Sequence, residues 1–362
     1  MRKDSKTLVT TIIGLDLGDR RSHACVLAEP SGELLERFEV ATTPEGLRAR
    51  FQGRARSRVV LEASGPSPWV SRLLVELGHE VFVANTRRLA LISQSDRKTD
   101  RHDAETLARL VRSEVGLLGR PVIHRGAREQ AHLELIKARD VLVRCRTALI
   151  NHVRGVLKSL GHRAVKCTAE AFDRKASAAV PDDVREALDP LLEQIGVLTA
   201  RIRGYDRRVE EVAARDYPIT SLLRRVNGVG PLTSLAYVLV LGDPRRFRAS
   251  RSVGPYLGLA PASQQSGDSD PQLRITKAGN PFLRRLLVNC AQYMLGPFGT
   301  DSTLRRYGQA LMLRGGKNAK RRAVVAVARK VAVLLHRLWI TGEVYEPLRE
   351  ARSLPTLLAP TA

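Results

Sequence analysis

Cysteine is scarce in this chain, and the few cysteines are scattered. The 362 residues contain Cys25, Cys145, Cys167 and Cys290, with no CxxC pair. This spacing excludes a disulfide framework and a zinc finger, and it is typical of reduced thiols in cytosolic proteins. No apolar run approaches the roughly 18 residues of a membrane-spanning helix, and the first residues lack a signal-peptide pattern. We therefore expect a cytoplasmic protein with no membrane partner.

Acidic residues are also in short supply. The chain has 37 acidic and 60 basic residues, a formal net charge of +23. The excess is uneven, because residues 245–330 hold 17 basic and 3 acidic residues, whereas residues 1–114 hold 19 and 16. Such a basic stretch attracts polyanions, and nucleic acid is the usual partner. The phosphate-binding surface is therefore expected mainly in the C-terminal third.

The first third of the chain alternates between strand and helix patterns. Apolar, β-branched runs bounded by turn residues predict five strands, and three helical patterns follow or separate the later ones. The predicted strands cover residues 8–17, 23–28, 34–40, 58–62 and 80–84, and the predicted helices cover residues 44–51, 68–77 and 100–112. This order, three strands and then helix, strand, helix, strand and helix, is that of the α/β ribonuclease-H fold. A mixed α/β sheet of another kind gives similar signals.

Four carboxylates in this pattern are at positions that could form a metal site. Asp16 lies inside the first apolar strand, where a lone charge is costly unless it is paired or binds a metal ion. Glu62 ends the fourth strand, and Asp100 and Asp103 share one face at the start of the last helix. In the ribonuclease-H arrangement these places converge at one end of the sheet. Clustered carboxylates repel one another unless a divalent cation bridges them, so Mg²⁺ or Mn²⁺ is the expected cofactor. Individually, each also fits an ordinary role as a cap or a solvated strand end.

The first strand is open to a second interpretation. Residues 14–18, with the sequence GLDLG, resemble the first phosphate loop of the actin, sugar-kinase and chaperone ATPase fold. That fold also needs a second Asp-Gly-Gly loop and a glycine-rich adenosine site, and the sequence has neither. A single short loop is a weak signal, so the ribonuclease-H order is the better account of this region.

The middle of the chain is helical. Residues 127–160 repeat apolar side chains every seven positions, and Asp189 with Pro190 is typical of the cap and first position of a new helix. Within that second helix, apolar residues alternate four and three apart between Leu191 and Val212, which predicts a coiled-coil seam. The seam fits either an antiparallel pair with 127–160 or a pairing between subunits, and the pairing between subunits is the hypothesis favoured here.

The C-terminal third carries nucleic-acid signals. Gly228 and Gly230 form a GxG hairpin between two helical patterns, as in helix-hairpin-helix modules, whose backbone N–H groups bind phosphate. A polar serine-glycine loop follows at 258–268. Four basic residues lie beyond this loop and are predicted to bind nucleic acid: Arg274, Lys277, Arg284 and Arg285. Residues 305–322 hold seven basic residues and no acidic one, which is consistent with a strip that contacts a phosphate backbone.

Taken together, these segments resemble one known family, the DEDD transposases of the IS110 class of prokaryotic insertion sequences. The resemblance covers most of residues 10–340. It rests on IIGLDLG with Asp16, VVLEASG with Glu62, KTDRHDAE with Asp100 and Asp103, VNGVGPLTS, RRFRASRSVGPYLGLAPASQQSG, and ITKAGNPFLRRLLV with Lys277, Gly279, Asn280, Arg284 and Arg285.

The resemblance implies a domain plan and a nucleophile. The plan is a RuvC-like catalytic domain at 1–115, a helical coiled-coil linker at 116–215, a mainly α C-terminal transposase domain at 216–345 and a tail at 346–362. The family's serine nucleophile falls on Ser266 by its place in the Pro-x-x-x-x-Ser-Gly pattern. Relatives often continue with glycine and a basic residue, whereas this chain continues with Asp268 and Ser269.

The predicted function is that of a DNA transposase, a site-specific recombinase of an insertion sequence. Asp16, Glu62, Asp100 and Asp103 would bind Mg²⁺, and Ser266 would attack the scissile phosphate. Similarity to the family implies that a structured guide RNA selects element ends and target DNA. It also implies a nucleoid-associated location in the prokaryotic cytoplasm. The expected assembly is a homo-oligomer, a dimer or tetramer joined through the coiled coil. Two alternatives stay open: a metal-dependent nuclease of the Holliday-junction-resolvase type that uses water, and a nucleic-acid-binding protein without catalytic activity.

Overall fold

The computed structural model describes residues 9–85, 100–113, 121–162, 166–266, 271 and 273–348, and in the helix at 100–113 it describes the side chains from 102 to 112. The chain divides into two compact units, Met1–Arg128 and Glu129–Ala362. None of the described helices is both long and apolar enough to span a membrane.

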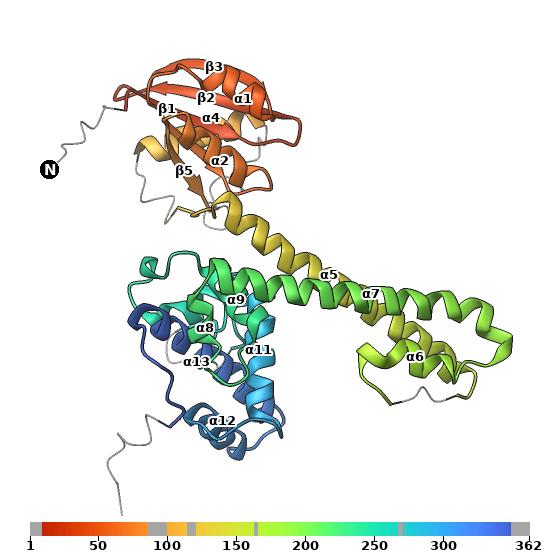
Figure 1. Cartoon of the computed structure of the whole chain (residues 1–362). Helices are drawn as coiled ribbons and strands as arrows, with labels where there is room; N and C mark the ends of the chain where they lie inside the picture. Colours follow the sequence, from red (N-terminus) through yellow and green to blue (C-terminus); the bar gives the residue numbers. More distant parts are fainter. Residues whose placement is uncertain are drawn as a thin grey trace, which may run out of the picture. The chain divides into compact units, whose positions relative to one another are not determined.

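The first unit is built around a mixed five-stranded sheet (Figure 1). Its strands are β1 (Thr11–Asp16), β2 (Arg21–Ala28), β3 (Leu34–Ala41), β4 (Arg58–Glu62) and β5 (Glu80–Ala84). In space they follow the order β3-β2-β1-β4-β5; β2 is antiparallel to both β1 and β3, whereas β4 and β5 run parallel to β1. The predicted order of strands and helices along the chain is confirmed among the described residues, and the sheet topology is consistent with a ribonuclease-H-like sheet.

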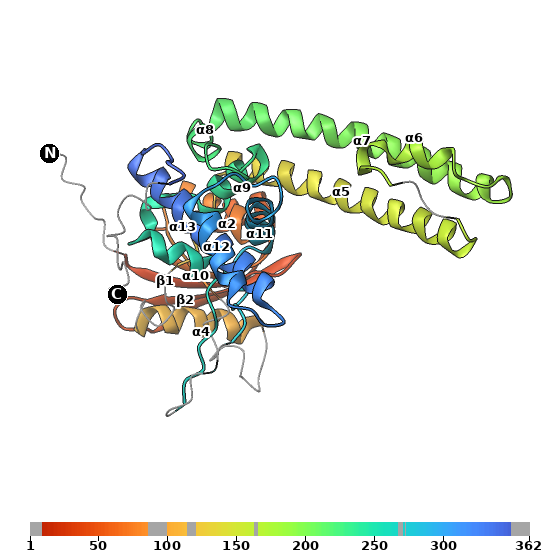
Figure 2. The same ribbon diagram turned by 90° about the horizontal axis from the view of Figure 1, so that it is seen from below.

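Helices cover both faces of the sheet. α1 (Pro44–Phe51) and α2 (Ser67–Glu76) pack on the face that carries Ile13 and Leu15 of β1. α4 (Asp100–Ser113) packs on the opposite face and lies along β1 and β2 (Figure 2). The sheet is therefore enclosed between two apolar layers, which explains why its central strands are apolar on both faces.

The second unit begins with a long antiparallel helix pair, drawn side by side in Figure 2. Its elements are α5 (Ala127–Ser159), η3 (Ala169–Ala171), α6 (Phe172–Ser177) and α7 (Asp182–Asp216). The guanidinium of Arg139 on α5 donates to the carboxylate of Asp206 on α7 at 2.8 Å, and Arg146 donates to Thr199 at 3.2 Å. Residues later on α5 thus meet residues earlier on α7, so the two helices run in opposite directions.

The apolar seam of α7 is buried within this pair. Leu198 and Ile202 on the seam are 6% and 3% exposed. The antiparallel pairing inside the chain, one of the two alternatives from the sequence, is therefore the one in the structure. A pairing between subunits is not needed to bury this stripe.

The start of α7 differs from the prediction. The sequence placed a new helix at Asp189 and Pro190, but α7 begins at Asp182 and Pro190 lies inside it. A proline in a helix interior removes one backbone hydrogen bond and costs roughly 3 kcal/mol. Leu188 and Leu192 on either side pack into an apolar cluster with Phe172 of α6, and this burial offsets the loss.

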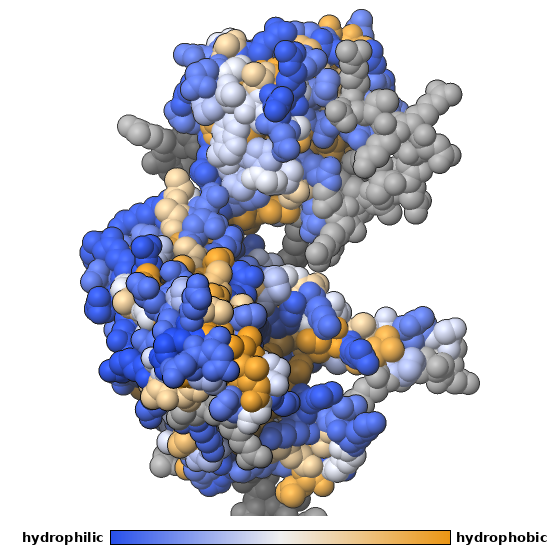
Figure 3. Space-filling view, turned by 90° about the vertical axis from the view of Figure 1, so that its right-hand side faces the viewer, coloured by the Kyte–Doolittle hydropathy of each residue, from blue (hydrophilic) through white to orange (hydrophobic). Residues whose placement is uncertain are grey.

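The rest of the second unit is a compact helical body. Its helices are α8 (Ile219–Leu223), α9 (Pro231–Leu241), α10 (Val253–Tyr256), α11 (Pro281–Leu295), α12 (Thr303–Leu313) and α13 (Ala319–Thr341), with short η4 (Pro244–Arg246) and η5 (Ser250–Ser252) between them. α9 is buried along most of its length, and the Tyr237 hydroxyl donates to the Ala332 carbonyl of α13 at 2.6 Å. In the view of Figure 3, hydrophilic residues cover most of the described surface, with separate hydrophobic patches among them.

Candidate functional site

Two of the predicted carboxylates end neighbouring strands. Asp16 is the last residue of β1 and Glu62 is the last residue of β4. The two strands are parallel, with Leu15 beside Leu61, so both carboxylates lie at the same edge of the sheet. Alternate residues of a strand share a face. Ile12 of β1 and Val60 of β4 pack against α4, so Asp16 and Glu62 are on the face that α4 covers. Both side chains are half-buried.

The first turn of α4 is directed toward the same edge. Near the other end of α4, the guanidinium of Arg112 donates to the Pro30 carbonyl, beyond the end of β2 that pairs with the start of β1. The helix therefore runs antiparallel to β1, and its N-terminal turn, with Asp103, lies toward Asp16. Gly14 permits this packing, because a Cβ there would collide with the backbone of α4.

The carboxylate site as a whole lies partly outside the described side chains. Asp100 is the first residue of α4, but its side chain is among those not described. Among the side chains that are described, no group of three or more His, Cys, Asp or Glu residues is arranged to hold a metal ion. The donor chemistry, carboxylate oxygens alone at one sheet edge, suits a hard cation such as Mg²⁺. The four-residue metal site stays a prediction.

Glu105, two residues after Asp103, has a different role. Its carboxylate accepts hydrogen bonds from Arg37 at 2.5 Å and from Arg109 at 2.8 Å. These bonds hold the pKa of Glu105 below its usual range. The side chain is thus committed to an ion-pair cluster between α4 and β3.

In the second unit, the serine loop is a structured arm. Residues 260–262 run antiparallel to residues 274–276, with backbone hydrogen bonds from Thr276 to Ala260 at 3.0 Å and from Ala262 to Arg274 at 2.9 Å. We call the described residues 258–266, 271 and 273–279 the arm. The sequence predicted a polar serine-glycine loop here. It did not predict the backbone pairing between the two sides of this segment.

The base of the arm is fixed by two glycines and an arginine. Gly258 and Gly279 have φ of +69° and +72°, and a Cβ on either would collide with the backbone of the opposite side. The guanidinium of Arg284 on α11 donates to the carbonyls of Leu257 at 3.0 Å and Ala278 at 2.8 Å, one on each side of the base. Burial lowers the pKa of Arg284. This predicted nucleic-acid-binding residue therefore holds the arm together.

Ser266 lies in the outer part of the arm. It is exposed, as is Ser263, whereas Ser269 and Asp268 lie outside the described residues. Within the described part of the chain, no side chain hydrogen-bonds to the Ser266 hydroxyl. The hydroxyl is exposed, and no described side chain is placed to activate it.

The GxG hairpin connects α8 to α9 as predicted. Gly228 adopts φ +84° and packs against Tyr293 of α11, and Gly230 precedes Pro231, the first residue of α9. The side chain of Asn227 donates to the Thr300 hydroxyl, which ties the hairpin to the loop after α11. The turn is thus held in place by its own unit.

The remaining predicted basic residues have different surroundings. Arg285 forms an ion pair with Asp140 of α5 at 2.5 Å, and its guanidinium lies over the Phe282 ring. Arg274 and Lys277 are exposed on the arm. Both line a groove of the second unit.

This groove, which we call the arm–α13 groove, extends from the arm across α12 and α13 and has a volume of about 1350 Å³. Exposed basic side chains surround it: Arg274, Lys277, Arg314, Arg321, Arg322 and Arg329, together with Lys330 and Arg337. The sequence predicted the basic strip only as far as residue 322. The continuation on α13 was missed, although Arg322 and Arg329, like Lys330 and Arg337, are seven residues apart and so share a helix face.

Comparison with known proteins gives matches over both units. A family model described as "Transposase", of the DEDD IS110 type, matches residues 13–162, and the model of the "Transposase IS116/IS110/IS902 family" matches residues 220–309. The two matches contain Asp16, Glu62, Asp100, Asp103 and Ser266.

Individual relatives agree with these models. A "Probable family 20 transposase" of Pseudomonas aeruginosa is 31% identical over 297 residues, which cover 80% of this chain and 86% of the relative. The "Transposase for insertion sequence element IS1111A" of Coxiella burnetii is 29% identical over 79% of each chain. A "Pilin gene-inverting protein" of Moraxella lacunata is 23% identical over 90% of this chain and 94% of the relative.

Proposed function

Because this chain belongs to the IS116/IS110/IS902 family of transposases, and is therefore a DNA phosphoryl-transfer enzyme, we propose that it cuts and rejoins DNA with a carboxylate centre and a serine nucleophile. The carboxylate centre is in the first unit and Ser266 is in the second. The observation that carries this proposal is the placement of Asp16 and Glu62 at one edge of the sheet, toward which the first turn of α4 is directed.

The carboxylate centre is a RuvC-like site in a ribonuclease-H-like domain. Asp16, Glu62, Asp100 and Asp103 would hold Mg²⁺ or Mn²⁺ through their oxygens. The bound ion supplies positive charge that activates a nucleophile and stabilises a leaving oxygen. Asp16 and Glu62 are half-buried at the ends of stiff central strands, which fixes their positions before DNA binds.

Ser266 performs the transfer itself. Its Oγ attacks the scissile phosphorus, an Oγ–P ester forms and the P–O bond to the sugar breaks. The serine proton passes to a base, and the departing sugar oxygen takes up a proton. The phosphoester bond energy is retained in the adduct, so rejoining needs no ATP. Since a serine hydroxyl is a weak nucleophile at neutral pH, and the described surroundings of Ser266 offer no side-chain partner, the carboxylate centre is the proposed source of activation.

Nucleic acid is bound mainly by the second unit. The helix-hairpin-helix-like turn at Gly228 and Gly230 would offer backbone N–H groups to a phosphate, and Arg274 and Lys277 on the arm would contact phosphates beside Ser266. In this proposal Arg284 and Arg285 mainly bind groups of the protein itself: Arg284 binds two backbone carbonyls and Arg285 pairs with Asp140. We further propose a structured guide RNA as a partner and an oligomer as the working form in the cytoplasm. The net charge of +23 supports polyanion binding in general.

A covalent-adduct assay tests the nucleophile. Ser266→Ala should remove the protein–DNA adduct in denaturing gels and leave DNA affinity unchanged, whereas Ser263→Ala, on the same exposed stretch, should retain the adduct. An adduct that survives Ser266→Ala and is lost in Ser263→Ala or Ser269→Ala would move the nucleophile to that serine. Cleavage without any adduct, and with no serine required, would support the water-dependent nuclease.

A further inference from the structure

The arm–α13 groove is larger than most pockets that bind small molecules. Its volume of about 1350 Å³ exceeds the roughly 300–1000 Å³ of most small-molecule pockets. The groove lies entirely within the second unit, between the arm and the α12–α13 pair. A polymer segment is the kind of occupant that fits it.

The charge around the groove points to a polyanion. Within the described chain, no carboxylate pairs with Arg314, Arg321, Arg329 or Lys330. Arg337 is paired with Glu343 at 3.2 Å, and Glu343 and Glu346 are the acidic side chains at one end. Cations held without acidic partners attract phosphates at little cost, since no internal ion pair has to be broken.

The floor of the groove is apolar, unlike a surface built for phosphates alone. Leu311 of α12 and Val325, Val333 and Leu334 of α13 line it and are half-buried. Tyr307 of α12 adds an aromatic ring that is 37% exposed, with the Lys330 ammonium 4.4 Å from the ring centroid. The groove lining therefore holds an aromatic ring and a cation next to each other, Tyr307 and Lys330.

We infer that the arm–α13 groove binds an unpaired stretch of nucleic acid, with bases against the apolar floor and Tyr307 and phosphates along the basic rim. A duplex presents phosphates and sugars, so it would satisfy the rim and leave the floor facing water. In a single strand the bases are free to turn inward and stack, which every base can do irrespective of sequence. This inference rests on the proposed function, because it specifies the nucleic acid bound beside the serine arm.

Fluorescence anisotropy on the full chain can separate the contribution of the groove floor to affinity from that of the basic rim. The probes are a labelled oligothymidine strand and a duplex of the same length. Tyr307→Ala should weaken single-strand binding by about 5-fold or more, the low end of one lost base stack, and change duplex binding less than about 2-fold. Tyr307→Phe should restore binding. Arg321→Ala should weaken both probes and reduce the slope of log affinity against log salt by about 1.

The chain provides a matched control in Tyr256. Tyr256 is 38% exposed and carries the Arg246 guanidinium 4.6 Å from its ring centroid, as Tyr307 carries Lys330, but it does not line the groove. Tyr256→Ala should bind both probes like the unmodified chain. Equal effects of Tyr256→Ala and Tyr307→Ala, or equal losses for strand and duplex in Tyr307→Ala, would overturn the inference. Because no chemistry is needed for binding, this outcome is independent of the Ser266 adduct assay.

Discussion

Arg284 directs its guanidinium at two backbone carbonyls, one on each side of the arm base. Arg284→Met should therefore loosen the arm and misplace Ser266. We expect the single-turnover rate of adduct formation to fall by at least about 10-fold, since small misplacements of a reacting group are costly. DNA affinity should stay within about 2-fold, and Arg284→Lys should recover part of the rate through one charged donor.

The two readouts distinguish positioning from phosphate binding. A variant that loses DNA affinity but keeps its rate at saturating DNA would return Arg284 to the nucleic-acid-binding set predicted from the sequence. Arg201→Met provides the comparison, because Arg201 is an exposed arginine on α7 of the same unit and is far in sequence from both sides of the arm base.

Asp16 should be essential for cleavage. Asp16→Asn keeps the shape of the side chain but removes the charge that would hold a divalent cation, so DNA cleavage should be abolished while the circular dichroism spectrum is retained. Asp103→Asn should behave in the same way. Asp19→Asn, an exposed carboxylate three residues away, should leave cleavage intact. Full cleavage in EDTA would contradict the metal-dependent mechanism.

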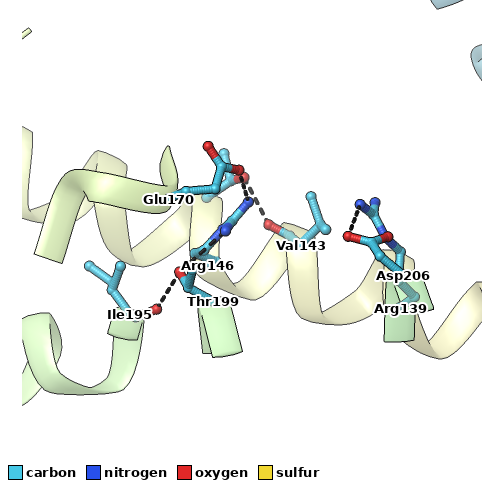
Figure 4. Close-up of polar contacts among 8 residues, drawn as sticks. Arg139, Val143, Arg146, Glu170, Ile195, Thr199 and Asp206 are labelled. Atoms are coloured by element: carbon cyan, nitrogen blue, oxygen red, sulfur yellow. Dashed lines mark hydrogen bonds and ion pairs between the residues drawn. The ribbon is translucent and has the colours of Figure 1, made fainter. Parts of the chain in front are cut away.

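At the scale of elements, the antiparallel pair α5–α7 contains a buried arginine. Arg146 is 6% exposed between the helices. Figure 4 shows its guanidinium between Thr199 of α7 and Glu170 of η3, to which it donates at 3.2 and 3.1 Å. Its Nε is buried and has no hydrogen-bond acceptor among the described residues. The charge is therefore only partly compensated.

This partial compensation predicts an asymmetry between the two partners. Arg146→Met removes a buried charge and should leave the free energy of unfolding unchanged or raise it by about 1 kcal/mol. Glu170→Ala leaves the buried guanidinium with one partner and should lower it by about 1–3 kcal/mol. Urea titrations of both variants measure the difference. A larger loss in Arg146→Met would mean that the arginine stabilises the pair.

The seam of α7 should behave as a core and not as a subunit contact. Leu198→Asp with Ile202→Asp places two charges between α5 and α7, where both positions are buried within one chain. We expect loss of helical signal and a lower Tm. A folded variant that is monomeric in light scattering, beside an oligomeric unmodified chain, would instead favour the pairing between subunits.

The elements differ in how far local sequence determines them. The strands of the sheet were predicted because alternation and apolar runs are local signals. The proline-containing start of α7 was misplaced because packing of Leu188 and Leu192 overrides the local preference of Pro190. The arm was missed as a structure because its base joins residue 258 to residue 277 and depends on Arg284, and such distant contacts leave no periodic pattern.

For the whole molecule, the sequence shows where basic residues are concentrated but not what each of them binds. The basic excess of residues 245–330 lies in the part of the chain that supplies most of the groove lining, and its use in phosphate binding stays a prediction. It could not separate Arg284, which holds backbone carbonyls, or Arg285, which pairs with Asp140, from the cations of the rim. Composition counts charges, whereas function depends on which charges keep an internal partner.

The division of the proposed site between two units leads to a test of assembly. The carboxylates lie in Met1–Arg128 and Ser266 lies in Glu129–Ala362, with the α5–α7 pair between them in sequence. We expect one active site to combine the carboxylates of one subunit with the serine of another, so that catalysis begins only after assembly. An Asp16→Asn variant and a Ser266→Ala variant, each inactive alone, should then recover adduct formation when they are mixed.

The mixing experiment has a built-in control. A double variant with both substitutions on one chain, mixed with the unmodified chain, shows how far inactive subunits lower activity by dilution alone. With sites shared between subunits, the adduct in the mixture of single variants should form only on the Asp16→Asn chain, which retains Ser266. If that mixture stays inactive although light scattering shows that the chains co-assemble, each subunit must supply its own carboxylates and serine.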